Sequence, residues 1–72
     1  MPNSGLKIYK IGVREKEYLD REVIIEATCL MEAIDCVTKE QISKKSKSWK
    51  TRLISERDCY GKILRKGNGK YD

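Results

Sequence analysis

The residue types in this chain limit the chemistry that it can perform. It contains no His, the most common acid/base residue and metal ligand, among its 72 residues. Its paired carboxylates, such as Glu15/Glu17 and Glu56/Asp58, fall on expected turns beside Arg and Lys, where they are explained as solvated charges. No Ser or Cys has a neighbouring base in the sequence that could activate it. The composition therefore favours binding over catalysis, with no catalytic residue, no cofactor and no metal site.

Two further motifs have simple explanations. The three cysteines, Cys29, Cys36 and Cys59, form no CxxC pair, so we interpret them as small buried or half-buried thiols in a reducing cytosol. A metal or redox role is the alternative. The run Gly67-Asn68-Gly69-Lys70 resembles a phosphate-binding loop, but it lacks the following Ser or Thr and the strand-to-helix context. It is typical of a hairpin turn.

Basic residues gather in one short segment. Residues 1–40 carry six Lys or Arg against eight Asp or Glu, whereas residues 41–72 carry ten against three. Such an imbalance predicts a negatively charged partner, although solvated surface lysines would give the same composition. The densest cluster lies within nine residues and surrounds Trp49, which could stack on a base or belong to the core: Lys44, Lys45, Lys47, Lys50 and Arg52.

Hydrophobic periodicity places this cluster between a helix and a strand. β-forming residues at 6–13 and 22–27 predict two strands joined by a charged turn at 14–20. Strand 6–13 alternates imperfectly, which a bulge or burial on both faces would explain. Leu30, Ile34 and Val37 then form one apolar helical stripe, so we predict a helix over 29–41, capped by Thr28 or Cys29.

The remainder of the chain predicts a second pair of strands. A Ser/Lys loop at 42–48 leads to a strand at 49–55, a turn at 56–58 and a strand at 59–66. A turn at 67–69 leaves room for a short last strand at 70–72. Lys62, Arg65, Lys66 and Lys70 would then join the basic cluster in one positive stripe.

These elements define a fold class. The predicted fold is a single α+β domain over 1–72, with an antiparallel four- or five-stranded sheet and one helix on one face, in the order β-β-α-β-β. No apolar run approaches the ~20 residues of a membrane span, and the start lacks the features of a secretory signal. We therefore expect a protein of the cytosol with no membrane partner.

The segments around the helix resemble a known family. Glu26-Ala27, Cys29-Leu30 and Lys39-Glu40-Gln41, followed by 51–54, 60–64 and Gly69-Lys70-Tyr71, are similar in order and spacing to small phage anti-CRISPR proteins. The similarity is to the ninth family of type I-F inhibitors. It covers nearly the whole chain, but Ile34 and Asp35 replace a basic pair of that family, and Cys29 replaces a Ser.

The resemblance implies a function and a partner. Such inhibitors bind the backbone subunits of a type I surveillance (Cascade-like) complex of the host and obstruct pairing of guide RNA with target DNA. They can also contact double-stranded DNA without sequence specificity. The resemblance carries over Lys39 and Gln41, at the end of the helix, as interacting positions. With the basic cluster, the expected binding face is Lys39, Gln41, Lys44, Lys45, Lys47, Lys50 and Arg52.

Two other functions fit the same residues. A non-specific nucleic-acid-binding protein would use the basic loop and strand directly, and its affinity would fall steeply with salt. A structural or assembly component of a virion is the other alternative. An inhibitor with a packed protein interface would depend less on salt than direct DNA binding does.

Overall fold

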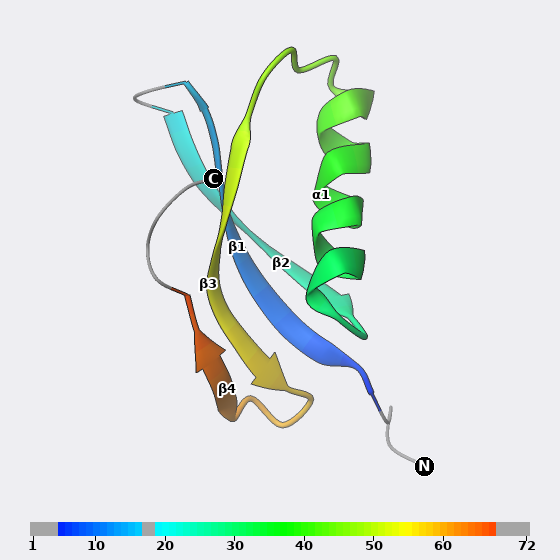
Figure 1. Cartoon of the computed structure of the whole chain (residues 1–72), viewed down its shortest axis with the longest axis vertical. Coiled ribbons are helices and arrows are strands. Elements are labelled where there is room, and N and C mark those ends of the chain that lie inside the picture. Colours follow the sequence, from blue (N-terminus) through cyan, green and yellow to red (C-terminus); the bar gives the residue numbers. More distant parts are fainter. Residues whose placement is uncertain (1–4, 17–18, 68–72) are drawn as a thin grey trace.

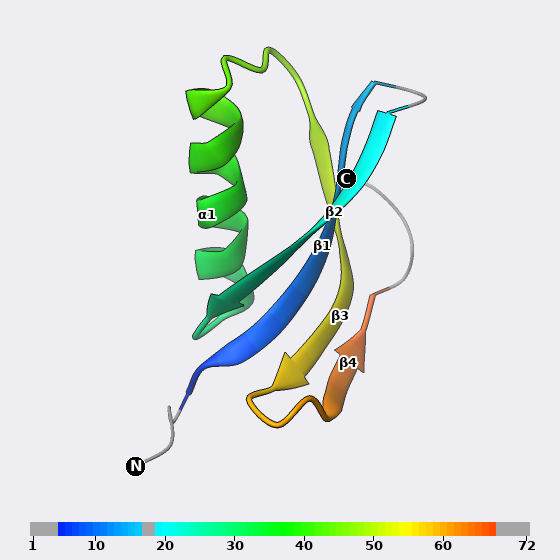
Figure 2. The same cartoon turned by 180° about the vertical axis from the view of Figure 1, so that it is seen from behind.

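The computed structural model describes residues 5–16 and 19–67. Its fold is a four-stranded antiparallel sheet with one helix packed against one face (Figures 1 and 2). This confirms the predicted α+β class and the β-β-α-β-β order. The strands lie in the order β2-β1-β3-β4, so the first strand is central. The elements are β1 (Lys7–Lys16), β2 (Leu19–Ala27), α1 (Leu30–Ser43), β3 (Lys50–Asp58) and β4 (Ile63–Lys66).

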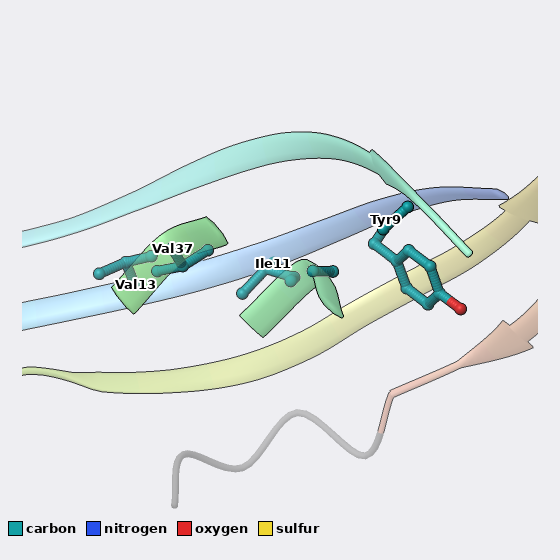
Figure 3. Packing of buried hydrophobic residues seen from close by; sticks show 6 residues of the cluster. Tyr9, Ile11, Val13 and Val37 are labelled. Atoms are coloured by element: carbon teal, nitrogen blue, oxygen red, sulfur yellow. The ribbon is translucent and has the colours of Figure 1, made fainter. Parts of the chain in front are cut away.

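The core lies between β1 and the inner face of α1. Tyr9, Ile11 and Val13 occupy alternate positions of β1 and are fully buried, and they point to the helix face of the sheet. Val37 lies beside Val13, and the ring of Tyr9 reaches from β1 towards β3 (Figure 3). On the opposite, open face of the sheet, Ile8 is half-buried. Burial on both faces therefore explains the imperfect alternation of the first strand.

The helix begins without a capping side chain. Cys29, the second of the two predicted residues, occupies the N-cap position with extended backbone angles, but its side chain makes no cap bond. Thr28 does not cap the helix through its hydroxyl, which was the first of the two predictions. Its hydroxyl and its backbone N–H both donate to the carboxylate of Glu32, at 2.9 and 3.3 Å. Glu32 thus accepts the hydrogen bond of a backbone N–H just before the first helical turn and places a negative charge there.

Strand β3 carries a bulge that decides which side chains face the helix. Ile11 pairs with Leu53 and Lys10 pairs with Ser55, so Ile54 is an extra residue. Because of it, Leu53 and Glu56 lie on the same face although three positions separate them.

The boundaries of the last two strands differ from the prediction. The turn predicted at 56–58 is wrong, because Glu56 pairs with Tyr9 and the strand continues to Asp58. The connection instead lies at 59–62, and β4 is limited to Ile63–Lys66 rather than 59–66. A side chain at Gly67 would overlap the backbone carbonyl of Leu53, so only glycine fits where the chain leaves β4. Positions 68 and 69 of the predicted turn, and the strand predicted at 70–72, lie outside the described residues.

Candidate polyanion-binding surface

The end of α1 sets the shape of the basic loop, which is residues 44–49 between α1 and β3. The N–H of Lys45 donates to the carbonyl of Ile42 at 2.9 Å, and the N–H of Ser46 donates to that of Gln41 at 3.0 Å. This pair of bonds is a Schellman motif, which ends helices with a left-handed residue. That residue is usually Gly, but here it is Lys45, with φ of 60°. The motif turns the chain away from the helix and directs Lys44, Lys45 and Lys47 outward at one end of the molecule.

A polar network beneath this loop fixes its position. The amide nitrogen of Gln41 donates to Glu15 Oε1 at 2.9 Å and to the Ser46 hydroxyl at 3.2 Å. Its amide oxygen accepts from Arg21 Nη2 at 2.6 Å, and the same nitrogen donates to Glu40 at 2.7 Å. The network therefore joins β1, β2, α1 and the loop into one unit.

This network changes the role expected for Gln41. Its side chain is fully buried, so it presents no surface to a partner. Lys39, which the resemblance also carried over, is exposed and pairs with Asp35 at 3.3 Å, one helical turn earlier. The two positions at the end of the helix thus lie in opposite environments, one inside the molecule and one on its surface.

Hydrogen bonds and nearby cations keep the carboxylates of this network ionised. The bond from Gln41, aided by Lys44 and Arg21, lowers the pKa of Glu15 although partial burial opposes the shift. The bond from Arg21 lowers the pKa of Glu40 in the same way. Glu40 also holds Lys44 at 3.5 Å. The charge of Lys44 is therefore partly compensated within the protein.

Three lysines of the cluster differ from Lys39 and Lys44. Within the part of the chain that the structure describes, Lys45, Lys47 and Lys50 are exposed and take part in no ion pair. A hollow of about 380 Å³ lies under the loop, lined by Glu15 and by Lys44, Lys45, Ser46, Lys47 and Ser48. These lysines carry positive charge that only a partner or solvent can balance.

The register extends the basic surface from the loop onto the open face of the sheet. Lys50 lies opposite Arg14, and Arg52 lies opposite Gly12, on the face away from the helix. On the same face β2 is acidic, since it carries Asp20, Glu22 and Glu26. Arg14 binds Asp20 at 3.0 Å, and Lys10 binds Glu22 at 3.3 Å. The open face is therefore negative along β2 and positive along the first half of β3.

The single positive stripe predicted along the last two strands is wrong. Strand β4 pairs only with residues 55–57 of β3, so it lies at the far end from Lys50 and the loop. Arg65 lies opposite Glu56 and binds its carboxylate at 3.0 Å, and Lys66 lies opposite Ser55. Trp49 is half-buried against the core, which confirms the core alternative for this residue.

The buried carboxylate of Glu56 was missed in the sequence because it looked like a turn residue. Its side chain is 9% exposed and accepts from Lys7 at 3.3 Å, from the Tyr9 hydroxyl at 3.2 Å and from Arg65. Burial, followed by the charge of Glu56, raises the pKa of Tyr9. The hydrophobic run ends at Ile54 and four polar residues follow it, so no local pattern indicated that the strand continues to Asp58.

The cysteines are exposed, not buried as predicted: Cys29, Cys36 and Cys59 all lie on the surface as free thiols. Among residues 5–16 and 19–67, no group of His, Cys, Asp or Glu is arranged to hold a metal ion. In the same residues, no helix is long and apolar enough to cross a membrane.

Neither a protein-family model, nor a curated protein, nor a solved structure matches the chain.

Proposed function

We propose that this protein is an inhibitor that acts by binding, without catalysis, to a type I CRISPR surveillance complex in the host cytosol. The binding site would be the backbone subunits that hold the guide RNA, and binding would obstruct pairing of the guide with target DNA. The sequence resemblance around the helix supports this proposal, and the β-β-α-β-β order agrees with it.

One observation carries the proposal. Lys45, Lys47 and Lys50 lie together at one end of the molecule, exposed and without an ion pair within the described residues. The Schellman motif and the Gln41 network hold the backbone beneath them. A fixed positive edge of this kind complements a negatively charged channel, and it aids association and specificity more than raw affinity.

The other expected residues have secondary roles in this proposal. Lys44 precedes Lys45 at the end of the helix, Arg52 follows Lys50 on the open face of the sheet, and Lys39 is exposed on the helix. Gln41 acts from below by holding the loop. A standard interface needs about 800 Å² from each partner. The protein exposes 5365 Å² in total, which exceeds this requirement.

The test is a pull-down from the lysate of a host that carries a type I system, with the purified protein as bait. The lysate is treated with nuclease, and the beads are washed at moderate salt. We expect the wild-type protein to retain a stoichiometric complex and the double variant Lys45→Glu/Lys47→Glu to lose it. The matched control, Lys10→Glu/Lys66→Glu, lowers the net charge equally at positions away from the loop and should retain it. Equal behaviour of the two variants, or recovery of no complex by the wild type, would contradict the proposal.

A second candidate function is direct, non-specific binding of double-stranded DNA. It is favoured by the position of Lys50 and Arg52 beside Arg14 on the open face, which continues the basic surface of the loop. In that case the affinity for a plain duplex falls log-linearly with salt, with a slope of about −0.9 for each phosphate contact. Recovery of nucleic acid before nuclease treatment, and of nothing after it, would support this function over the first.

A further inference from the structure

The turn between β3 and β4 presents an aromatic side chain to solvent. Tyr60 is 81% exposed, whereas Tyr9 is buried and Trp49 is half-buried against the core. An aromatic ring with this much exposed surface has little role in holding the fold together. The turn between β3 and β4 lies at the opposite end of the molecule from the loop between α1 and β3 (Figure 1).

Hydrogen bonds fix the backbone of this turn. The carboxylate oxygen Oδ1 of Asp58 accepts from the N–H groups of Tyr60 and Lys62, each at 2.9 Å. The backbone of Asp58 binds Lys62 at 2.9 Å and Gly61 at 3.0 Å. Gly61 has φ of 90°, a left-handed conformation that glycine adopts at little cost. The backbone that carries Tyr60 is thus ordered before any ligand arrives, which lowers the entropic cost of binding.

The charges around the turn are positive. Lys62 is exposed and takes part in no ion pair within the described residues. The guanidinium of Arg57 lies at the turn, where Nη1 donates to the carbonyl of Gly61 at 2.8 Å. Lys66 follows on the open face of β4. The one carboxylate of the turn, Asp58, is occupied by backbone N–H groups through Oδ1.

We propose that this turn is a binding site for single-stranded nucleic acid. An unpaired base would stack on the ring of Tyr60, and Lys62 would contact an adjacent phosphate. Exposed aromatic rings beside Lys or Arg bind single strands in this manner, since every base offers a π-face. A duplex would gain little, because its bases are already stacked on one another. The basic surroundings favour this ligand over a protein pocket, for which an exposed Tyr alone would also be suited.

This site does not depend on the proposed inhibitor function. It rests on the β3–β4 turn, whereas that proposal rests on the loop at the other end. The two can therefore fail separately.

The test is fluorescence anisotropy with a labelled oligothymidylate and with a duplex of equal length, at low salt. We expect Tyr60→Ala to weaken single-strand binding about fivefold or more, which corresponds to the loss of one stacked base. Tyr60→Phe should bind like the wild type, because the ring is kept, whereas Tyr60→Leu should behave like Tyr60→Ala. Binding of the duplex should be unaffected by all three. Lys62→Ala should weaken binding of the single strand and reduce its salt slope by about one contact.

Several results would overturn the proposal. These are undetectable binding of oligothymidylate by the wild type, equal binding by Tyr60→Ala, or a loss with Tyr60→Phe as large as that with Tyr60→Ala. If Tyr60→Ala keeps oligonucleotide binding but loses a protein in the pull-down, the turn contacts protein instead. A circular dichroism spectrum and a thermal unfolding curve for each variant separate these outcomes from misfolding.

Discussion

Charged side chains meet at both ends of the sheet, and the two ends use them differently. Where α1 ends, the fully buried group is the neutral amide of Gln41, and Glu15, Arg21 and Glu40 surround it. Where β3 meets β4, the buried group is the carboxylate of Glu56 itself, held by Lys7, Tyr9 and Arg65 without the helix.

The comparison shows two ways to bury polarity in a small domain. A neutral amide costs less to desolvate than a charge, but each of its hydrogen bonds has to be satisfied by the protein. A buried carboxylate costs more, and it is kept only with cations close by. The cations around Glu56 remain 38% and 54% exposed, so water shares in their solvation. We therefore expect the loss of one contact to destabilise the protein more at the helix end than at the end where β3 meets β4.

The largest effect is expected at Gln41. Gln41→Ala leaves Arg21, Glu15 and Ser46 without a shared partner and opens a cavity, so it should lower the free energy of unfolding by about 3 kcal/mol. Urea denaturation measures the loss as a lower midpoint with an unchanged slope. The neighbouring control Lys39→Ala removes only an exposed pair and should change stability by about 0.5 kcal/mol or less. A loss below about 1 kcal/mol for Gln41→Ala would mean that water replaces the amide there.

A smaller loss is expected at the other end. Glu56→Gln keeps the shape but removes the charge that Lys7 and Arg65 face, and it should cost about 1–2 kcal/mol after allowance for their exposure. Urea denaturation in low and high salt measures it. Glu26→Gln, at an exposed position of β2, is the matched control and should have little effect. If Glu56→Gln cost as much as Gln41→Ala, the two ends would not differ in the way described.

At Lys45, a substitution is expected to raise the stability of the protein and not to lower it. Lys45→Gly places the residue that the left-handed position favours, so it should raise stability by about 0.5–1 kcal/mol. The same change removes one of the three lysines and should weaken retention of the complex in the pull-down. Lys47→Gly removes the same charge without relieving a left-handed residue, so it should not stabilise. Lower thermal stability of Lys45→Gly than of the wild type would contradict the Schellman assignment.

The two ends should also respond to opposite extremes of pH. Glu15 and Glu40 have lowered pKa values in the fold, so their stabilisation is lost as pH falls below the ordinary glutamate pKa towards the folded values. Tyr9 has a raised pKa, so its stabilisation is complete below the ordinary tyrosine pKa of about 10 and is lost as pH rises above it. Urea midpoints measured across pH check both the loss of stability at acid pH and the loss at alkaline pH.

Two single variants test which end of the sheet causes the loss of stability at acid pH (the acid limb) and which causes the loss at alkaline pH (the alkaline limb). Glu15→Gln should flatten the acid limb and leave the alkaline one, and Tyr9→Phe should do the reverse. If either variant altered both limbs equally, the two networks would be coupled through the sheet.

The sequence was sufficient for the order of elements, because periodicity reports which face of an element is buried. The stripe of Leu30, Ile34 and Val37 and the alternation of Val23, Ile25 and Ala27 both describe contacts that the fold contains. The core position of Trp49 follows in the same way. These signals are local, so they are visible without knowledge of the partner elements.

The errors involve contacts between distant residues. Glu56 resembles a turn residue until it pairs with Tyr9, 47 positions earlier. Gln41 is a polar residue near the end of a helix, which is typical of an exposed position, but in the fold Arg21 and Glu15 surround it. The basic residues of β4 were expected beside Lys50, but β3 continues to Asp58 and β4 pairs only with residues 55–57. No local pattern specifies such pairings, because they arise only when the strands align.

The extra residue in β3 has an evolutionary consequence. Since Ile54 and Ser55 together oppose Lys10, loss of the codon for Ile54 would leave Leu53 opposite Ile11 and Glu56 opposite Tyr9. The same loss anywhere from Tyr9 to Val13 would turn half of the buried side chains of β1 to the other face. Relatives of this protein should therefore differ in length at position 54 and stay constant in length along the central strand.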